Sequence, residues 1–236
     1  WDQAMPEIPR AERAALWDEL NRVIAALHAV DPPSVGLADF GRPGSYFERQ
    51  IARWSQQYRA SVTEPITAME RLIDWLPAHL PASARDDSRP VIVHGDYRLD
   101  NVIFHPTEPR ILAVLDWELS TLGHPLADLS YHCMAWHIPH ATGRGFGGLD
   151  PRALGLPTEA EYRARYLSRA PGRFDADEVA ADWNFYLAYN LFRIAAILQG
   201  VARRVVDGTA ASADAQAAGA LARPLADMGW ACAQRA

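Results

Sequence analysis

The stretch VIVHGDYRLDNVIF, residues 91–104, decides the fold. It contains two short apolar runs, Val91–Val93 and Val102–Phe104, separated by a turn that carries polar side chains. A third run, Ile111–Leu115, follows the turn HPTEPR. Short runs rich in β-branched residues and bounded by turn residues are typical of strands. We therefore predict a small β-element over residues 91–116.

Three oxygen-bearing side chains lie where these strands begin or end. Asp96 and Asn101 lie on the turn after the first strand, and Asp116 follows the third. If the second and third strands pair as an antiparallel hairpin, Asn101 and Asp116 come to the same end of it. Carboxylate and amide oxygens suit a hard cation such as Mg²⁺. A separate carboxylate, Asp96, can accept the proton of an attacking hydroxyl, so the pattern indicates phosphoryl transfer.

The rest of the chain is predicted to be helical, which makes the fold class α+β and mainly helical. Apolar residues recur at the three- to four-residue spacing of amphipathic helices. We expect helices over residues 11–30, 46–61, 63–80, 125–136, 158–169, 175–204 and 212–235. Thr63 is the expected N-cap of the third helix, with Pro65 in its first turn. Residues 81–90 read as a polar linker.

The composition excludes some classes of function. With 236 residues and 49% hydrophobic content the chain can bury a sizeable core. A net charge of −6 argues against nucleic acid as a partner. No apolar run approaches the about 20 residues that span a bilayer, and no signal-peptide pattern is present. We expect a cytoplasmic location, no membrane partner, and buried free thiols at Cys133 and Cys232. A homodimer is left open.

The motif HGDYRLDN, residues 94–101, resembles the catalytic loop HGDxxxxN of the aminoglycoside phosphotransferase and choline kinase group. That loop is similar to the Asp-x-x-x-x-Asn pattern of protein kinases. The segment LDWE, residues 115–118, is similar to the metal-binding segment of the same group. The resemblance implies a protein-kinase-like fold, with ATP as the phosphoryl donor and Mg²⁺ as the metal.

The same resemblance implies roles for single residues. Asp96 would be the catalytic base, and Asn101 and Asp116 would hold Mg²⁺ and the nucleotide. His94 and Gly95 would shape the loop.

Four further residues have expected roles. Arg98 matches the place where many protein kinases carry a lysine that touches the transferring phosphate, and a solvated loop residue is the other interpretation. Asp128, in GHPLADL, matches an aspartate that braces the catalytic loop. Glu118 could reach the metal or substrate, or form a salt bridge. Arg193 lies within the apolar LFRIAAIL, so it needs an internal acid or a bound anion.

Two patterns are interpreted as structural. A zinc site would need a fourth ligand at suitable spacing, and Pro139 interrupts the helix, so we predict none from His132, His137 and His140. A helical stripe is read as core rather than as a substrate wall. It consists of Trp183, Tyr186, Tyr189 and Asn190.

The resemblance narrows to one subgroup. YFERQIARWSQQY and FYLAYNLFRIAAILQG look like the phosphotransferase-like domain associated with acyl-CoA dehydrogenases. A hydroxyacyl-CoA is the acceptor this implies, and an aminoglycoside-like alcohol is the other candidate. The chain has no lysine, and no glycine-rich loop precedes a strand at its start. The resemblance is thus to a C-terminal lobe over residues 1–236, without the N-terminal nucleotide lobe.

Within that lobe we expect a helical part (1–90), the β-element with the catalytic loop (91–116) and a second helical part (117–236). We expect this segment alone to be inactive. A kinase-shaped binding module without catalysis is the alternative function. A metal-dependent phosphohydrolase is less favoured, since such sites need several His and Asp at strand ends. A dehydrogenase is not supported, because no G-x-G-x-x-G follows a strand.

Overall fold

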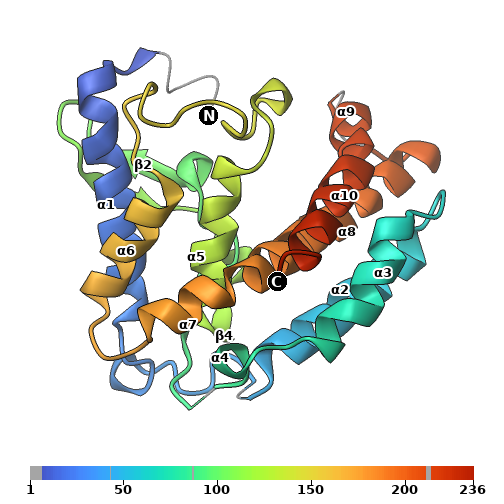
Figure 1. Cartoon of the computed structure of the whole chain (residues 1–236), viewed down its shortest axis with the longest axis horizontal. Helices are drawn as coiled ribbons and strands as arrows, with labels where there is room; N and C mark the ends of the chain where they lie inside the picture. The colour runs from blue at the N-terminus through green and yellow to red at the C-terminus, as the bar shows by residue number, and fades with distance from the viewer. Residues whose placement is uncertain (1–6, 43, 87, 211–213) are drawn as a thin grey trace. The chain divides into compact units, whose positions relative to one another are not determined.

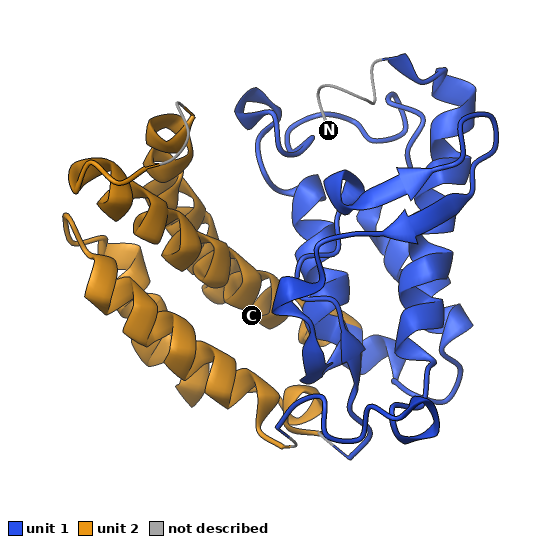
Figure 2. Cartoon of the chain, turned by 180° about the vertical axis from the view of Figure 1, so that it is seen from behind, with its two compact units in different colours: residues 1–43, 88–179 blue, residues 44–87, 180–236 orange. Residues whose placement is uncertain are grey.

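The computed structural model describes residues 7–42, 44–86, 88–210 and 214–236. The chain divides into two units, coloured separately in Figure 2. The first unit comprises Trp1–Pro43 and Ser88–Val179, and the second comprises Gly44–Asp87 and Ala180–Ala236. The predicted fold class, α+β and mainly helical, is confirmed.

The first unit carries the strands. Its helices are α1 (Arg10–His28), α5 (Pro125–Cys133), α6 (Glu159–Arg169) and α7 (Ala176–Ala181), of which α7 runs across the unit boundary. Its strands are β1 (Val91–Val93), β2 (Val102–Phe104), β3 (Ile111–Val114) and β4 (Thr121–Gly123). Short 3-10 helices lie at Pro33–Val35, Leu99–Asn101, Trp117–Leu119, Met134–Trp136 and His140–Thr142.

The strands form two separate two-stranded antiparallel sheets. The predicted hairpin of β2 and β3 is confirmed, with Val102 opposite Val114. The prediction missed β4, which pairs with β1 and places Thr121 opposite Val93. The β-element is therefore divided in two. The sequence TLG of β4 is short and ends in glycine, so it has little of the pattern that identifies a strand.

An aromatic cluster forms much of the core of the first unit. The helices α1 and α6 pack side by side (Figure 1) and contribute Trp17 and Tyr162 to it. His132 of α5 stacks on Tyr162 with 5.1 Å between ring centroids and meets Trp17 edge-on at 5.2 Å. Burial among these rings lowers the pKa of His132 to about 4. His132 is thus a neutral core residue, and no metal-binding group of three or more His, Cys, Asp or Glu occurs within the described residues.

The second unit is built from helices alone within its described part. These are α2 (Tyr46–Ser61), α3 (Thr67–Ala78), α4 (Ala82–Arg85), α8 (Trp183–Val206), α9 (Ala215–Ala220) and α10 (Ala222–Ala233). The long helix α8 packs against α2, α3, α9 and α10 (Figure 1). The predicted core stripe of α8 is confirmed, because all four of its side chains are buried.

Several predicted helix boundaries were wrong. The helix α3 begins at Thr67, after Ile66, and Thr63 is not its N-cap, because the Thr63 hydroxyl accepts a hydrogen bond from Gln199 Nε2 at 3.0 Å. The short helix α4 lies within the expected linker, where Ser83 Oγ donates to Asp182 Oδ2 at 2.5 Å.

Two predicted long helices are each broken. The first, expected over 175–204, divides at Asp182 into α7 and α8. The second divides at Leu221 into α9 and α10, and its expected start at 212 lies outside the described residues.

One expectation about apolar length needs correction. By length and composition α8 could cross a membrane, since its most apolar window has a mean hydropathy of 1.3. However, 72% of that window is buried inside the structure, as in a core helix. The two cysteines are buried and free, as predicted.

Candidate active site

The carboxylate of Asp96 is oriented by two side chains. The amide Nδ2 of Asn101 donates to Oδ2 and to the backbone oxygen of Asp96, at 2.9 Å each. The hydroxyl of Tyr131 donates to Oδ1 at 2.5 Å. The structure therefore brings Asp96 and Asn101 into direct contact, as predicted. A carboxylate held at both oxygens keeps a fixed direction, which a base needs in order to receive a proton at a defined position.

Tyr131 was not anticipated from the sequence. It lies on α5, three residues after Asp128, so both side chains are on the same face of the helix. That spacing is a signal that could have found Tyr131, since Asp128 was already expected to face the loop.

The third predicted residue, Asp116, is placed through its neighbour. The backbone N–H of Leu115 donates to the carbonyl of Asn101 at 2.8 Å, and the carbonyl of Leu115 accepts from Nε2 of His94, also at 2.8 Å. Leu115 is therefore tied to both ends of the catalytic loop. The next residue, Asp116, has a left-handed backbone (φ 65°, ψ 59°) and an exposed side chain.

This backbone conformation costs energy in a residue other than glycine, although aspartate tolerates it better than most. The bonds on Leu115 fix the chain immediately before it. The local structure thus turns the chain sharply at Asp116, at the end of the hairpin where Asn101 lies.

The donor set at this hairpin end suits a hard cation. Nδ2 of Asn101 is committed to Asp96, so its Oδ1 is the amide atom left for a metal. With the carboxylate of Asp116 this gives one amide and one carboxylate oxygen from the protein. Mg²⁺ is commonly held by one or two carboxylates together with phosphate oxygens and water. The residues present therefore fit Mg²⁺ bound to a nucleotide.

His94 is a structural member of the loop. It is fully buried, and its Nδ1 accepts the backbone N–H of Asp96 at 3.1 Å while Nε2 donates to Leu115. An imidazole that accepts at one nitrogen and donates at the other is neutral, with its hydrogen on Nε2. His94 thus links Asp96 to the residue that follows β3 and precedes Asp116.

Asp128 braces the loop, as the sequence indicated. Its Oδ2 accepts the backbone N–H of His94 at 2.5 Å, and its Oδ1 accepts that of Gly95 at 2.8 Å. Burial alone would raise the pKa of Asp128, but the hydrogen bond of His28 and the two backbone N–H groups hold it below its ordinary value. The carboxylate is therefore ionised at neutral pH. His28 was not anticipated from the sequence.

Gly95 is required by the geometry of the neck of the loop. Its φ is +84°, and a Cβ there would lie 2.6 Å from the carbonyl oxygen of Leu119. No side chain fits this position without displacing the backbone.

The remaining predicted residues differ in their surroundings. Arg98 lies 3.0 Å from the carboxylate of Asp100 and 3.5 Å from that of Asp96, so its side chain is beside Asp96. Glu118 is exposed on the 3-10 helix that follows Asp116. Arg193 belongs to the second unit, where its guanidinium lies 5.5 Å from the centroid of the Trp54 ring.

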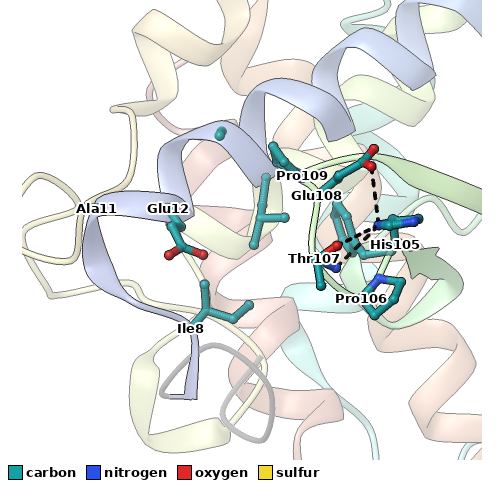
Figure 3. Close-up of a pocket in the computed structure, with 11 residues that line it drawn as sticks. Ile8, Ala11, Glu12, His105, Pro106, Thr107, Glu108 and Pro109 are labelled. Atoms are coloured by element: carbon teal, nitrogen blue, oxygen red, sulfur yellow. Dashed lines mark hydrogen bonds and ion pairs between the residues drawn. The ribbon is translucent and has the colours of Figure 1, made fainter.

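A pocket of about 530 Å³ lies at the other end of the β2–β3 hairpin (Figure 3). One wall is formed by Ile8, which precedes α1, and by Ala11, Glu12, Ala15 and Leu16 in the first turns of α1. The turn after β2 forms the other wall, from Phe104 to Pro109. None of the residues predicted for the site lines this pocket.

The class of protein follows from comparison with known families. Residues 2–167 match the phosphotransferase enzyme family. This segment contains the catalytic loop, the hairpin, Asp116 and Asp128. The chain belongs to this family, which confirms the resemblance seen in the sequence.

The chain is also similar in sequence to individual proteins of known name. The chain is 45% identical over 232 residues to mouse acyl-CoA dehydrogenase family member 10. The matched segment makes up 97% of this chain and 21% of the mouse protein. The chain thus spans about a fifth of the length of that relative.

Two solved structures are similar to this chain in fold. A Ralstonia eutropha JMP134 protein, assigned by its name to the aminoglycoside phosphotransferases, is 58% identical, with a TM-score of 0.91 over 99% of this chain and 69% of that one. The aminoglycoside phosphotransferase APH(4)-Ia, in a ternary complex with AMP-PNP and hygromycin B, shares the fold at 17% identity, with a TM-score of 0.57 over 97% of this chain and 68% of that one.

Proposed function

We propose that the chain is the catalytic lobe of a small-molecule kinase that transfers a phosphoryl group from Mg–ATP to an alcohol. The observation that carries this proposal is the Asp96 carboxylate, which is oriented by Asn101 while the same asparagine is bonded to the backbone just before Asp116. Asn101 thus connects the proposed base to the residue next to Asp116, the second residue expected to hold the metal. Membership of the phosphotransferase family supports the same reading.

Each residue has a distinct part in the proposed reaction. When bound, Mg–ATP supplies the phosphoryl group together with a cation that neutralises its charge. Asp96 accepts the proton of the acceptor hydroxyl, and Tyr131 and Asn101 keep the carboxylate directed toward it. Asn101 and Asp116 would hold the metal through oxygen atoms. Arg98, beside Asp96, contributes positive charge near the transferring group.

For the acceptor, we propose a hydroxyacyl-CoA. The names of relatives such as mouse acyl-CoA dehydrogenase family member 10 associate this domain with acyl-CoA chemistry. An aminoglycoside-like alcohol is the second candidate, supported by the hygromycin B complex of APH(4)-Ia. We also propose that a lobe preceding this one completes the nucleotide-binding site. We further propose that the protein acts in the cytoplasm.

A binding module without catalysis is the competing function. It is motivated by the lobe that carries the nucleotide-binding lysine in kinases of this fold, because residues 1–236 resemble only the other lobe and contain no lysine. Titration calorimetry with Mg–ATP, combined with a transfer assay, distinguishes the two. Tight binding without any transfer would support the module.

The test of the proposal is a mass-spectrometric screen of the full-length protein. It is incubated with Mg–ATP and, in parallel, hydroxyacyl-CoAs, aminoglycosides and choline-like alcohols. We expect a mass increase of one phosphoryl group on a hydroxyacyl-CoA, with Asp96→Asn as the inactive control. Phosphorylation of an aminoglycoside alone would correct the acceptor. Phosphorylation that persists unchanged in Asp96→Asn would overturn the assignment of the base.

A further inference from the structure

A chain of buried hydrogen bonds reaches the catalytic loop from outside the family motif. Nδ1 of His28, in the last turn of α1, lies 2.7 Å from the hydroxyl of Tyr166 on α6. Nε2 of the same ring lies 3.3 Å from Oδ2 of Asp128 on α5. His28 is 4% exposed, Tyr166 is 0% and Asp128 is 1%. Water therefore does not compete for these bonds.

The carboxylate of Asp128 sets the direction of these hydrogen bonds, because it can only accept and Nε2 of His28 must therefore donate to it. Burial raises the pKa of Tyr166 far above its ordinary value, so its hydroxyl keeps its proton. A hydroxyl that donates to Nδ1 leaves the imidazole hydrogen on Nε2, because each ring nitrogen of a neutral histidine either donates or accepts. The Nε2–H group then points at Asp128, which as a carboxylate can only accept.

This series of hydrogen bonds ends at the backbone of the catalytic loop. Asp128 already accepts two N–H groups, from His94 and Gly95, one at each oxygen. A third donor on Oδ2 restricts rotation of the carboxylate about its last bond. The orientation of Asp128 in turn fixes the His94–Gly95 peptide, directly before the base.

We propose that His28 is a positioning residue of the catalytic loop, which Tyr166 holds in the Nε2–H tautomer so that it directs Asp128 onto the N–H groups of His94 and Gly95. This inference rests on the proposed function for its effect on catalysis. Its effect on the loop itself can be measured without activity. Three helices that are distant in sequence thus converge on the neck of one loop.

Two substitutions of His28 separate positioning from packing. In His28→Gln the side-chain amide can place a donor near the position of Nε2, toward Asp128. In His28→Asn the shorter amide reaches only the position of Nδ1, toward Tyr166. The chain also offers a matched pair of hydroxyl deletions. Tyr166→Phe removes the donor to His28, and Tyr186→Phe removes an equally buried hydroxyl, 2.7 Å from Ser83, in the second unit.

The experiment measures steady-state kinetics of the full-length protein together with hydrogen–deuterium exchange of peptides that cover residues 91–101. We expect His28→Asn to lower kcat about 10- to 100-fold with KM for Mg–ATP nearly unchanged, as for other residues that orient a functional group. His28→Gln should recover most of that loss. Tyr166→Phe should lower kcat about threefold to tenfold, and Tyr186→Phe should leave it unchanged.

Exchange separates the failure of this inference from that of the function. We expect faster exchange of the loop amides in His28→Asn and Tyr166→Phe, but not in Tyr186→Phe. If the loop is equally protected in all variants, or if His28→Gln is no better than His28→Asn, the positioning role is wrong whatever the activity. If the wild-type protein transfers no phosphate while the exchange pattern holds, the proposed function fails and the loop support stands.

Discussion

Buried polar side chains around the loop that carries Asp96, in the first unit, bond differently from those of helix α2, in the second unit. In the first unit, His28, Asp128 and Tyr131 come from two helices and converge on one loop. In the second unit, Ser55 and Ser61 donate to backbone carbonyls of their own helix, α2. Convergent networks fix one geometry among distant segments, whereas local bonds only satisfy a buried group. In this comparison the side chains of the first unit orient the loop that carries Asp96, whereas the two serines of α2 bond only within their own helix.

The largest effect is expected at the base. Asp96→Asn keeps the size of the side chain but removes the proton acceptor, so we expect kcat to fall by about 10³-fold or more while Mg–ATP still binds. The control, Asp100→Asn, makes the same chemical change in the same loop at an exposed side chain that pairs with Arg98. Steady-state kinetics measure kcat, and titration calorimetry measures Mg–ATP binding, in both variants. Equal losses in the two variants would show that the loop depends on total charge and that Asp96 is not a base.

The second largest effect is expected at Asp128, which braces the loop. Asp128→Asn puts an amide where two backbone N–H groups and His28 now meet a carboxylate. We expect kcat to fall about 10- to 100-fold and the free energy of unfolding to fall by about 2–4 kcal/mol. The matched substitution in the second unit is Asp182→Asn, whose partner is the neutral hydroxyl of Ser83.

That control should cost less than about 1 kcal/mol and leave kcat unchanged, because the side-chain oxygen of asparagine can still accept the hydrogen bond of Ser83. Urea denaturation and kinetics on both variants make the measurement. A similar loss of activity in Asp182→Asn would contradict the division of roles between the units.

A pH-dependent difference between the units follows from His132. Its pKa is lowered from 6.5 to about 4 in the folded protein, so the unfolded chain takes up a proton between these values. This titration does not change the free energy of unfolding above pH 6.5, but it lowers it as the pH falls from 6.5 to 4, by about 3 kcal/mol in all. The second unit buries no histidine among its described residues.

The substitution His132→Phe keeps an aromatic ring in the cluster and removes the titration. We expect the variant to lose less stability than the wild type between pH 7 and pH 4.5, with little difference at pH 7. Urea denaturation at three pH values measures this. Parallel stability curves for the two proteins would exclude His132 as the group responsible.

The parts of the site that were predicted are those with a local pattern. Asp96 and Asn101 are five residues apart, and the hairpin that brings Asp116 to them is formed by neighbouring strands. The strand β4 and the break at Asp182 were missed because TLG and a single aspartate carry almost no periodicity. Most hydrogen bonds between distant positions were not predicted either.

The separations along the chain show why. Tyr131 is 35 residues from Asp96, His28 is 100 residues from Asp128, and Tyr166 is 138 residues from His28. One sequence does not show which buried polar side chains will meet at such distances. Asp128 was found only because the family motif contains it. The residues that support a site are therefore harder to predict than those that perform its chemistry.

The smallest expected effect compares two glycines with the same backbone conformation. Gly95 and Gly208 have φ of +84° and +70°, so alanine strains both by about 1 kcal/mol. At Gly208, in the second unit, a Cβ would meet open space. At Gly95 it would lie 2.6 Å from the carbonyl oxygen of Leu119, which as backbone cannot turn aside.

We therefore expect Gly95→Ala to lower the free energy of unfolding by about 2 kcal/mol more than Gly208→Ala, because a contact this close forces the backbone to shift. The shift should also lower kcat, since Gly95 adjoins Asp96, whereas Gly208→Ala should leave kcat unchanged. Urea denaturation and kinetics on the two variants isolate the close contact from the shared strain. Equal destabilisation in both would mean that the neck of the loop has room to relax, and that its geometry is held by Asp128 rather than by the approach of Leu119.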